Sequence, residues 1–215
     1  MTQYIPKFQE EYSAKLPSLT LLTNLGWSFL SPELALAARG GKTDEVVLRQ
    51  VLRSELQKRT FTFSGKSYPL SGKAIDNLIA EVCSPALNEG LLTVNERLYN
   101  HLLYGISVTE FVDGKKASPT VALIDWQNPA NNSFVFTEEF TVTRSGGVEN
   151  RRPDIVCFVN GIPLVVIEAK RTAFNITGEV LTDKTVKQCP EDVLFKVPSV
   201  NGSANLVRNS PYLTV

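Results

Sequence analysis

The chain has 215 residues, of which 43% are hydrophobic and 20% are charged, a composition typical of a globular domain with one large core. Its 22 Lys and Arg residues balance its 22 Asp and Glu residues, so any site for nucleic acid must be local. The three cysteines contain no CxxC pair and His101 is the only histidine, which excludes a disulfide scaffold, a Cys/His zinc site and a histidine-based triad. Neither a secretory leader nor an apolar run near the roughly 18 residues of a membrane span is found, so we expect a cytoplasmic protein without a membrane partner.

The apolar spacing of the first hundred residues predicts four helices. They should cover residues 12–25, 44–58, 72–83 and 95–104. Thr43 or Asp44 would cap the second helix and Ser71 the third, while Thr93 and Glu96 form a capping-box pattern for the fourth. The string GGKT before the second helix lacks the first glycine of a phosphate-binding loop, so we interpret it as an ordinary loop.

After Gly105 the pattern changes from helical to extended. The strands should cover residues 121–126, 134–144, 152–159 and 162–170. The last two strands are nearly continuous in apolar residues and are joined by Asn160-Gly161, a strong hairpin signal. Strands of this kind are buried on both faces, so we expect helices on each side of the sheet. From Thr172 onward we predict irregular structure with one short strand around residues 193–197.

Charged residues mark the outer ends of the two apolar strands. Pro153-Asp154 opens one strand and Glu168-Ala169-Lys170 closes the other, which matches the PD, spacer, (D/E)xK pattern of metal-dependent phosphodiesterases. Two carboxylates can hold a hard divalent cation, and a lysine two residues further on lies on the same strand face, where it can orient the attacking water. The alternative is that Lys170 only pairs with Glu168 or Asp154 at a solvated strand end.

The register of the hairpin tests the hypothesis of a metal site. With a strict two-residue turn, Asp154 would face Ile167, and Glu168 would lie on the other side of the sheet. A bulge or a three-residue turn, with Gly161 in a left-handed position, adds one residue to the hairpin. It places Asp154, Glu168 and Lys170 on one face, so we predict such a bulge or turn.

Four arginines flank the acidic strand ends in the sequence: Arg144, Arg151, Arg152 and Arg171. They predict a local rim that binds DNA phosphates in an otherwise neutral protein. A solvated rim without function is the alternative for each of them.

Residues 151–170, RRPDIVCFVNGIPLVVIEAK, closely resemble the nuclease motif of the restriction (R, or HsdR) subunit of type I restriction-modification enzymes. Four upstream stretches resemble the same family: LLTNLGW, NERLYNHLLYG, IDWQNP and NSFVFTEEF. The resemblance implies an α/β fold with a restriction-endonuclease-like (PD-(D/E)xK) core, in which helices flank a central mixed or antiparallel sheet. The implied N-terminal endonuclease domain covers residues 1–171, with a helical lobe at about 1–105 and a catalytic sheet at about 118–171, and an irregular tail follows at 172–215.

The resemblance also implies a function, hydrolysis of phosphodiester bonds in duplex DNA with Mg2+ as cofactor. Asp154, Glu168 and the main-chain carbonyl of Ala169 would bind the metal, and Lys170 would assist the attacking water. In this family the subunit assembles with modification (methyltransferase) and specificity subunits. ATP serves the motor of the full-length subunit, and we expect that motor to be absent from this chain.

Two departures from nucleases of this class keep other hypotheses open. Many of them carry a QxxxY helix soon after the lysine, whereas here Gln188 is followed by Cys189-Pro190. Some use a helical glutamate as an extra metal ligand, and Glu96 is a candidate, although its capping-box position explains it without a metal. The second hypothesis is therefore a catalytically inactive nuclease-fold fragment that acts as a DNA-binding or subunit-docking module. The third is an unrelated domain, with Asp154 and Glu168 more than about 8 Å apart.

Overall fold

The centre of the fold is a five-stranded mixed sheet. A computed structural model describes residues 11–84, 90–143, 149–169, 194–198, 204–208 and 212–214. The sheet has the order β1 (Ser28–Phe29), β8 (Phe134–Glu138), β11 (Ile155–Val159), β12 (Ile162–Glu168) and β15 (Tyr212–Thr214). Strand β11 runs antiparallel to its two neighbours β8 and β12, while the outer strands β1 and β15 pair in parallel with β8 and β12. The prediction of an α/β fold with a mixed sheet flanked by helices is confirmed.

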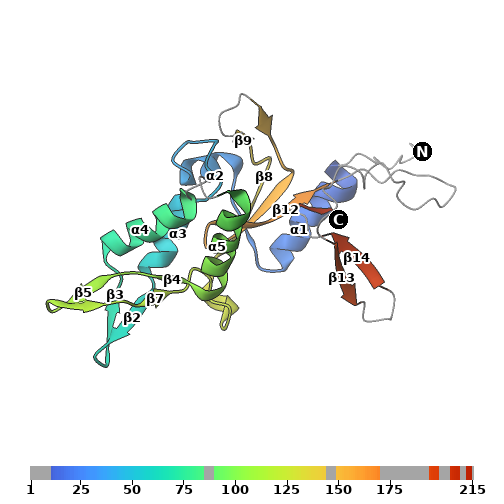
Figure 1. Cartoon of the computed structure of the whole chain (residues 1–215). Coiled ribbons are helices and arrows are strands. Elements are labelled where there is room, and N and C mark those ends of the chain that lie inside the picture. Colours follow the sequence, from blue (N-terminus) through green and yellow to red (C-terminus); the bar gives the residue numbers. More distant parts are fainter. Residues whose placement is uncertain are drawn as a thin grey trace, which may run out of the picture.

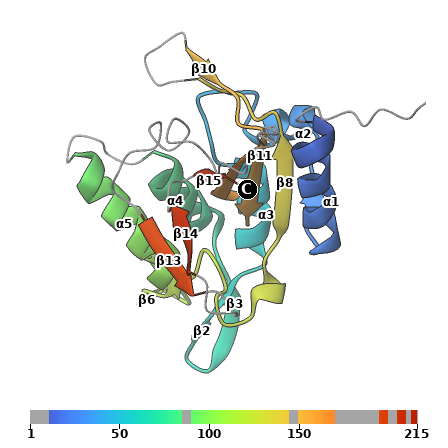
Figure 2. The same ribbon diagram turned by 90° about the vertical axis from the view of Figure 1, so that its right-hand side faces the viewer.

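Helices cover both faces of the sheet, as the apolar strands predict. On one face α1 (Leu16–Asn24), which continues the helical turn η1 (Glu11–Lys15), packs Leu22 against Ile155 and Cys157. On the other face, α2 (Pro32–Ala38) and the start of α3 (Arg49–Gln57) pack against Val156 and Phe158. Figure 1 shows α1 on one side of the strands and α2 and α3 on the opposite side, and Figure 2 shows α4 and α5 across the sheet from α1. Odd-numbered residues of β11 therefore face α1, and even-numbered residues face α2 and α3.

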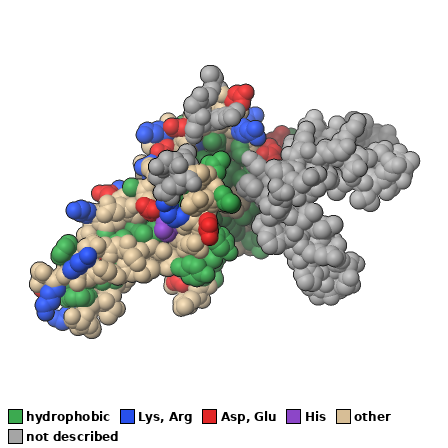
Figure 3. Space-filling view, in the orientation of Figure 1, with side chains coloured by type: hydrophobic (Ala, Val, Ile, Leu, Met, Phe, Trp, Pro, Cys, Tyr) green, Lys and Arg blue, Asp and Glu red, His purple; other side chains and the backbone are tan. Residues whose placement is uncertain are grey.

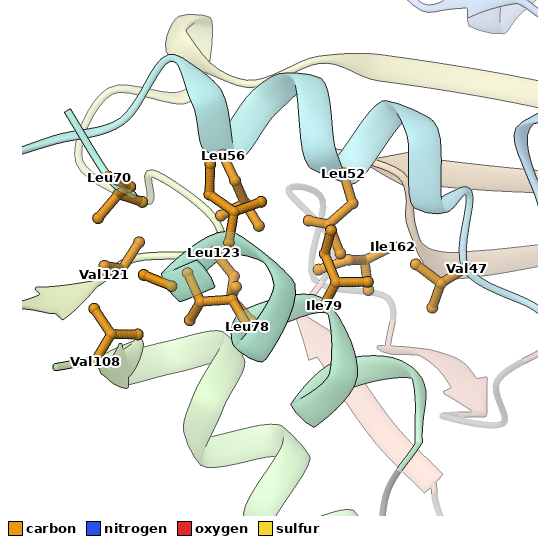
Figure 4. Close-up of a cluster of buried hydrophobic side chains, with 12 residues drawn as sticks. Val47, Leu52, Leu56, Leu70, Leu78, Ile79, Val108, Val121, Leu123 and Ile162 are labelled. Carbon is orange, nitrogen blue, oxygen red and sulfur yellow. The ribbon is translucent and has the colours of Figure 1, made fainter. Parts of the chain in front are cut away.

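A separate apolar core holds the helical part of the molecule together. It joins α3 and α4 (Gly72–Cys83) to the hairpin residue Ile162 and to residues in and beside β4 (Ile106–Ser107) and β7 (Thr120–Val121). Figure 4 shows the side chains of Leu52 and Leu56 from α3 directed toward Leu78 and Ile79 from α4. The helix α5 (Leu91–Tyr104) lies beside this core. Within the described residues, no helix has the length and apolar content that crossing a membrane requires.

Short two-stranded ribbons extend the helical part and the end of the sheet. They are β2 (Thr60–Phe63) with β3 (Lys66–Pro69), β4 (Ile106–Ser107) with β7 (Thr120–Val121), β5 (Glu110–Val112) with β6 (Lys115–Ala117), and β9 (Val142–Thr143) with β10 (Asn150–Arg151). The sequence analysis predicts none of the first three pairs. Strands β4 to β7 have only two or three residues each, too few to show a period of two, whereas the alternating Thr and Phe residues of β2 are a strand signal that was missed. The strand predicted over residues 121–126 is reduced to its first residue.

The predicted helix boundaries are confirmed in part. Helix α4 covers residues 72–83 as predicted, and the Ser71 hydroxyl accepts a hydrogen bond from the Ala74 amide. Helix α3 starts at Arg49, so the caps predicted at residues 43 and 44 are wrong; the string GGKT lies in the loop before it, as predicted. Helix α5 starts at Leu91 with Gly90 as its N-cap, so the capping box that includes Glu96 is wrong.

The tail contains more regular structure than the sequence predicts. The strand expected around residues 193–197 is present as β13 (Leu194–Pro198), and it pairs with β14 (Ala204–Arg208). The edge strand β15 is the larger difference, because it pairs in parallel with β12 across a long stretch of chain. Local patterns do not reveal a partner that is so distant in the sequence.

Both described cysteines are expected to react slowly with thiol reagents. Burial raises the pKa of the Cys157 thiol to about 11, and burial also raises the pKa of Cys83. Because the thiolate is the nucleophile, in a Cys189→Ser variant at pH 8 we expect iodoacetamide to modify the partly exposed Cys83 before the buried Cys157. Peptide mass spectrometry over time measures this order. Equal rates for the two cysteines would contradict the buried position of Cys157 beneath α1.

Candidate active site

The hairpin of β11 and β12 turns through Asn160 and Gly161, which both have left-handed backbone angles (φ 52° and 82°). Val159 pairs with Ile162, so the turn has two residues. The Asn160 side chain donates hydrogen bonds to the carbonyl of Leu123 (2.8 Å) and to the side-chain oxygen of Asn132 (2.9 Å). These bonds fix the left-handed conformation, which asparagine adopts more readily than most residues.

A bulge shifts the register farther along the hairpin. Phe158 pairs with Pro163 but Cys157 pairs with Val165, so Leu164 is the extra residue. The predicted bulge is thus confirmed, while its predicted position at Gly161 is wrong. Pro163 suits this position because it has no amide hydrogen to give to the ladder.

The shifted register brings the two acidic ends of the strands together. Ile155 pairs with Ile167, and continuing this register by one residue sets Asp154 opposite Glu168. Asp154 Oδ2 accepts a hydrogen bond of 2.7 Å from the amide of Ala169, whose peptide bond joins it to Glu168. Both carboxylates belong to the sheet face that carries Val156 and Val166, and both residues are half-buried. This arrangement argues against the unrelated domain, for which we expected the two residues to be far apart.

The main chain of Asp154 is held from the other side by the segment that follows β8. The Glu139 amide donates to the Asp154 carbonyl (3.0 Å), and the Phe140 amide donates to the Pro153 carbonyl (3.2 Å). Glu139 has a left-handed φ of 52°, and this break interrupts the strand that the sequence predicts over residues 134–144. Asp154 is therefore fixed between the segments on both sides of it.

An ion-pair cluster next to Asp154 is a feature that the sequence analysis missed. Lys15 Nζ lies 2.8 Å from a carboxylate oxygen of Glu138 and 2.6 Å from one of Glu139, and Arg152 Nε lies 2.6 Å from the other Glu139 oxygen. Burial alone would lower the pKa of Lys15, but its hydrogen bonds to the two glutamates raise that pKa above the ordinary value. The signal in the sequence is the acidic pair at the end of an apolar strand.

A cavity of about 480 Å3 opens on the same face of the sheet. Val142, Val156 and Val166 contribute to its mostly apolar wall, and Arg151 is the one charged residue among the described residues that line it. Arg151 and Arg152 are both exposed. On the face seen in Figure 3, basic side chains are scattered among acidic and neutral ones, so a phosphate-binding surface there would be local, as the balanced charge requires.

The remaining candidates either lie elsewhere or fall outside the described residues. Glu96 is exposed on α5 beside a second cavity, whose wall includes Ile162 and Pro163. Those residues begin β12, whereas Glu168 ends it, so Glu96 is at the far end of the strand from Asp154. The structure does not describe Arg144, Lys170, Arg171 or Gln188. No group of three His, Cys, Asp or Glu side chains suited to a metal occurs in the part of the chain that it describes.

The segment IDWQNP has a structural explanation. Asp125 accepts hydrogen bonds from the Asn131 side chain (2.8 Å) and the Asn128 amide (2.9 Å), and these bonds hold its pKa below the ordinary value. The Asn132 side-chain oxygen accepts from the Asp125 amide (2.9 Å) and from Asn160. This turn therefore supports the hairpin that carries the acidic residues.

These elements define a mixed α/β domain with a pair of carboxylates at one end of a hairpin in its central sheet. Residues 7–187 match the family described as "Type I restriction enzyme R protein N terminus", and the chain belongs to this family. It is 30% identical over 159 residues to the type I restriction enzyme HindI endonuclease subunit of Haemophilus influenzae, a match that covers 71% of this chain and 14% of the relative. It is 28% identical over 186 residues to a protein of Methanocaldococcus jannaschii named as the type I restriction enzyme MjaIXP endonuclease subunit. This second match covers 83% of this chain and 17% of the relative. The chain thus spans less than a fifth of the length of these relatives.

Proposed function

We propose that the chain is a Mg2+-dependent DNA endonuclease domain that hydrolyses phosphodiester bonds of duplex DNA in the cytoplasm. The observation that carries this proposal is the bulge-shifted register, which sets Asp154 opposite Glu168 and bonds its carboxylate to the Ala169 amide. The chain's membership of the family of type I restriction enzyme R protein N termini supports a nuclease function. The restriction-endonuclease-like fold of the core is part of the same proposal.

The proposed ligands of Mg2+ are the Asp154 and Glu168 carboxylates and the Ala169 carbonyl. Carboxylate and carbonyl oxygens are hard donors, and Mg2+ prefers such donors and keeps waters in its other positions. When bound, the metal would neutralise charge on the phosphate and acidify a water molecule. Lys170, the next residue along the chain, would orient the attacking water or stabilise the charge that develops on the phosphate.

The proposed DNA contacts are the arginines around the site, Arg151 and Arg152 together with Arg144 and Arg171. The Arg152 side chain pairs with Glu139 and is largely exposed. Arg152 could therefore exchange the Glu139 carboxylate for a DNA phosphate with little rearrangement. In the longer relatives such a domain would act beside an ATP-driven motor, with modification and specificity subunits as partners. Recognition of a DNA sequence would come from those partners.

Nicking of supercoiled plasmid DNA tests the proposed function. We expect nicking to require Mg2+, to stop with EDTA, and to fall at least about a hundredfold in Glu168→Gln and Lys170→Ala, because each removes charge on which the reaction depends. Glu33→Gln and Lys66→Ala, which change exposed residues outside the site, serve as matched controls and should cut normally.

Two outcomes would contradict this function. If the purified chain binds DNA with a salt-dependent affinity yet cuts none at any Mg2+ concentration, it is the inactive DNA-binding module considered above. If it neither binds nor cuts DNA, a role in subunit docking remains.

A further inference from the structure

Arg39, at the C-terminal end of α2, is a buried charge on the site face of the sheet. Its side chain is packed over the Phe140 ring, with the guanidinium carbon 4.0 Å from the ring centre, and the residue is only 3% exposed. Burial lowers its pKa. No carboxylate lies within ion-pair distance of it in the described part of the chain, and its Nε has no hydrogen-bond partner there. An isolated buried cation is costly, so its contacts need an explanation.

The guanidinium joins two loops through their main-chain carbonyls. Arg39 Nη1 donates to the Glu45 carbonyl (2.9 Å), in the loop before α3, and to the Thr141 carbonyl (3.0 Å), in the segment between β8 and β9. The hydroxyls of Thr43, in the same loop before α3, and Thr143, in β9, lie 2.7 Å apart, and the Thr143 amide donates to the Thr43 carbonyl. The segment between β8 and β9 is thereby attached to the α2–α3 side of the fold.

A continuous series of contacts leads from Arg39 to the candidate metal ligand. The guanidinium packs over the ring of Phe140 and donates a hydrogen bond to the carbonyl of Thr141. The neighbouring amides donate to the next strand, Phe140 to the Pro153 carbonyl and Glu139 to the Asp154 carbonyl. The Asp154 carboxylate in turn accepts a hydrogen bond from the Ala169 amide. Since the break at Glu139 takes this segment out of the β8 ladder, its position rests on contacts outside that ladder, and Arg39 supplies two of them.

We propose that Arg39 is a positioning residue of the nuclease site, which holds segment 139–141 and through it the placement of the Asp154 carboxylate. This inference rests on the proposed function, but its first test requires neither metal nor cleavage. A merely structural role would change the stability of the whole domain. A positioning role changes the contact between Asp154 and Ala169 more than it changes the remainder of the fold.

Hydrogen exchange of the metal-free protein, followed by NMR, measures that contact through the Ala169 amide. In Arg39→Met we expect the amides of Glu139, Phe140 and Ala169 to exchange at least about tenfold faster, while the Leu78 amide in α4 changes little. Arg39→Lys, whose ammonium retains the positive charge and three N–H donors, should restore part of the protection. Asp154→Ala defines the full loss at Ala169. Val121→Ala, in the separate helical core, controls for a general loss of stability.

The Mg2+ requirement for nicking is the second measurement. We expect Arg39→Met to need about tenfold more Mg2+ than the wild type for half-maximal nicking. This is the lower end of the loss in metal affinity caused by mutating residues that orient metal ligands. Val121→Ala should need the same Mg2+ concentration as the wild type. Unchanged exchange at Ala169, or a uniform increase that includes Leu78, overturns the inference. Wild-type protein that does not nick DNA overturns the proposed function alone, since the exchange result still decides the role of Arg39.

Discussion

Replacing Asp154 by asparagine is expected to reduce Mg2+-dependent nicking by at least about a hundredfold while leaving the fold intact. Asparagine retains a side-chain oxygen that can accept the hydrogen bond from the Ala169 amide, now 2.7 Å from Oδ2. It lacks the negative charge that a hard cation requires, and the loss of several kcal/mol of charge stabilisation corresponds to a factor on the order of 100 to 10,000 in rate. Gel analysis of nicked plasmid over time measures the change.

The matched control for this variant is Asp113→Asn. Asp113 is an exposed aspartate in the turn between β5 and β6, where its left-handed φ of 50° suits asparagine equally well. Its nicking rate and its unfolding midpoint should equal those of the wild type. Normal cutting by Asp154→Asn would show that Asp154 has no part in the mechanism. A lowered unfolding midpoint of Asp154→Asn would mean that the charge of Asp154 stabilises the fold.

Replacing Gly161 by alanine is expected to lower the free energy of unfolding by about 2–5 kcal/mol. Gly161 has φ of 82°, a conformation that costs other residues roughly 1–2 kcal/mol. A Cβ atom there would lie 2.7 Å from the carbonyl oxygen of Leu48 and 2.9 Å from the amide nitrogen of Leu52, at the start of α3. Relieving this overlap would disturb the hydrogen bond from the Leu48 amide to the Gly161 carbonyl and adds about 1–3 kcal/mol. Urea denaturation measures the loss.

Gly114→Ala separates the two contributions to this loss. Gly114 has a similar φ of 77°, but a Cβ atom there would meet nothing within 4 Å. This variant should therefore lose only the roughly 1–2 kcal/mol of the backbone conformation. Equal losses in the two variants would show that the close approach of α3 to the hairpin contributes nothing to stability.

The sequence predicts the elements whose signals are local. Ser71 caps its helix as expected, because a hydroxyl that accepts from an amide three residues later needs no tertiary partner. The apolar run in β11 likewise predicts burial on both faces, and the strand is buried along its whole length between helices on each side. The same prediction for β12 is confirmed only in part, because Ile162 and Ile167 are buried while Leu164 is exposed. The alternation of side chains along a strand also predicts that one extra residue is required to bring Asp154 and Glu168 to one face.

Features that depend on tertiary contacts could not be predicted in the same way. The extra residue is Leu164 rather than part of the turn, because Asn160 is fixed by Leu123 and Asn132 from other segments. Helix α3 starts five residues later than predicted, where Leu48 bonds to the distant hairpin. The contacts of Arg39 involve only main-chain carbonyls and a ring, which leave no pattern in the sequence.

The bulge at Leu164 also constrains how this hairpin can evolve. Inserting or deleting a single amino acid between Asp154 and Glu168 would turn one carboxylate to the face covered by α1. Homologous hairpins can therefore differ in length by an even number of residues, whereas an odd difference requires that a bulge be gained or lost at the same time. Parity of loop length, rather than the identity of the turn residues, is the property that natural selection would preserve in active descendants.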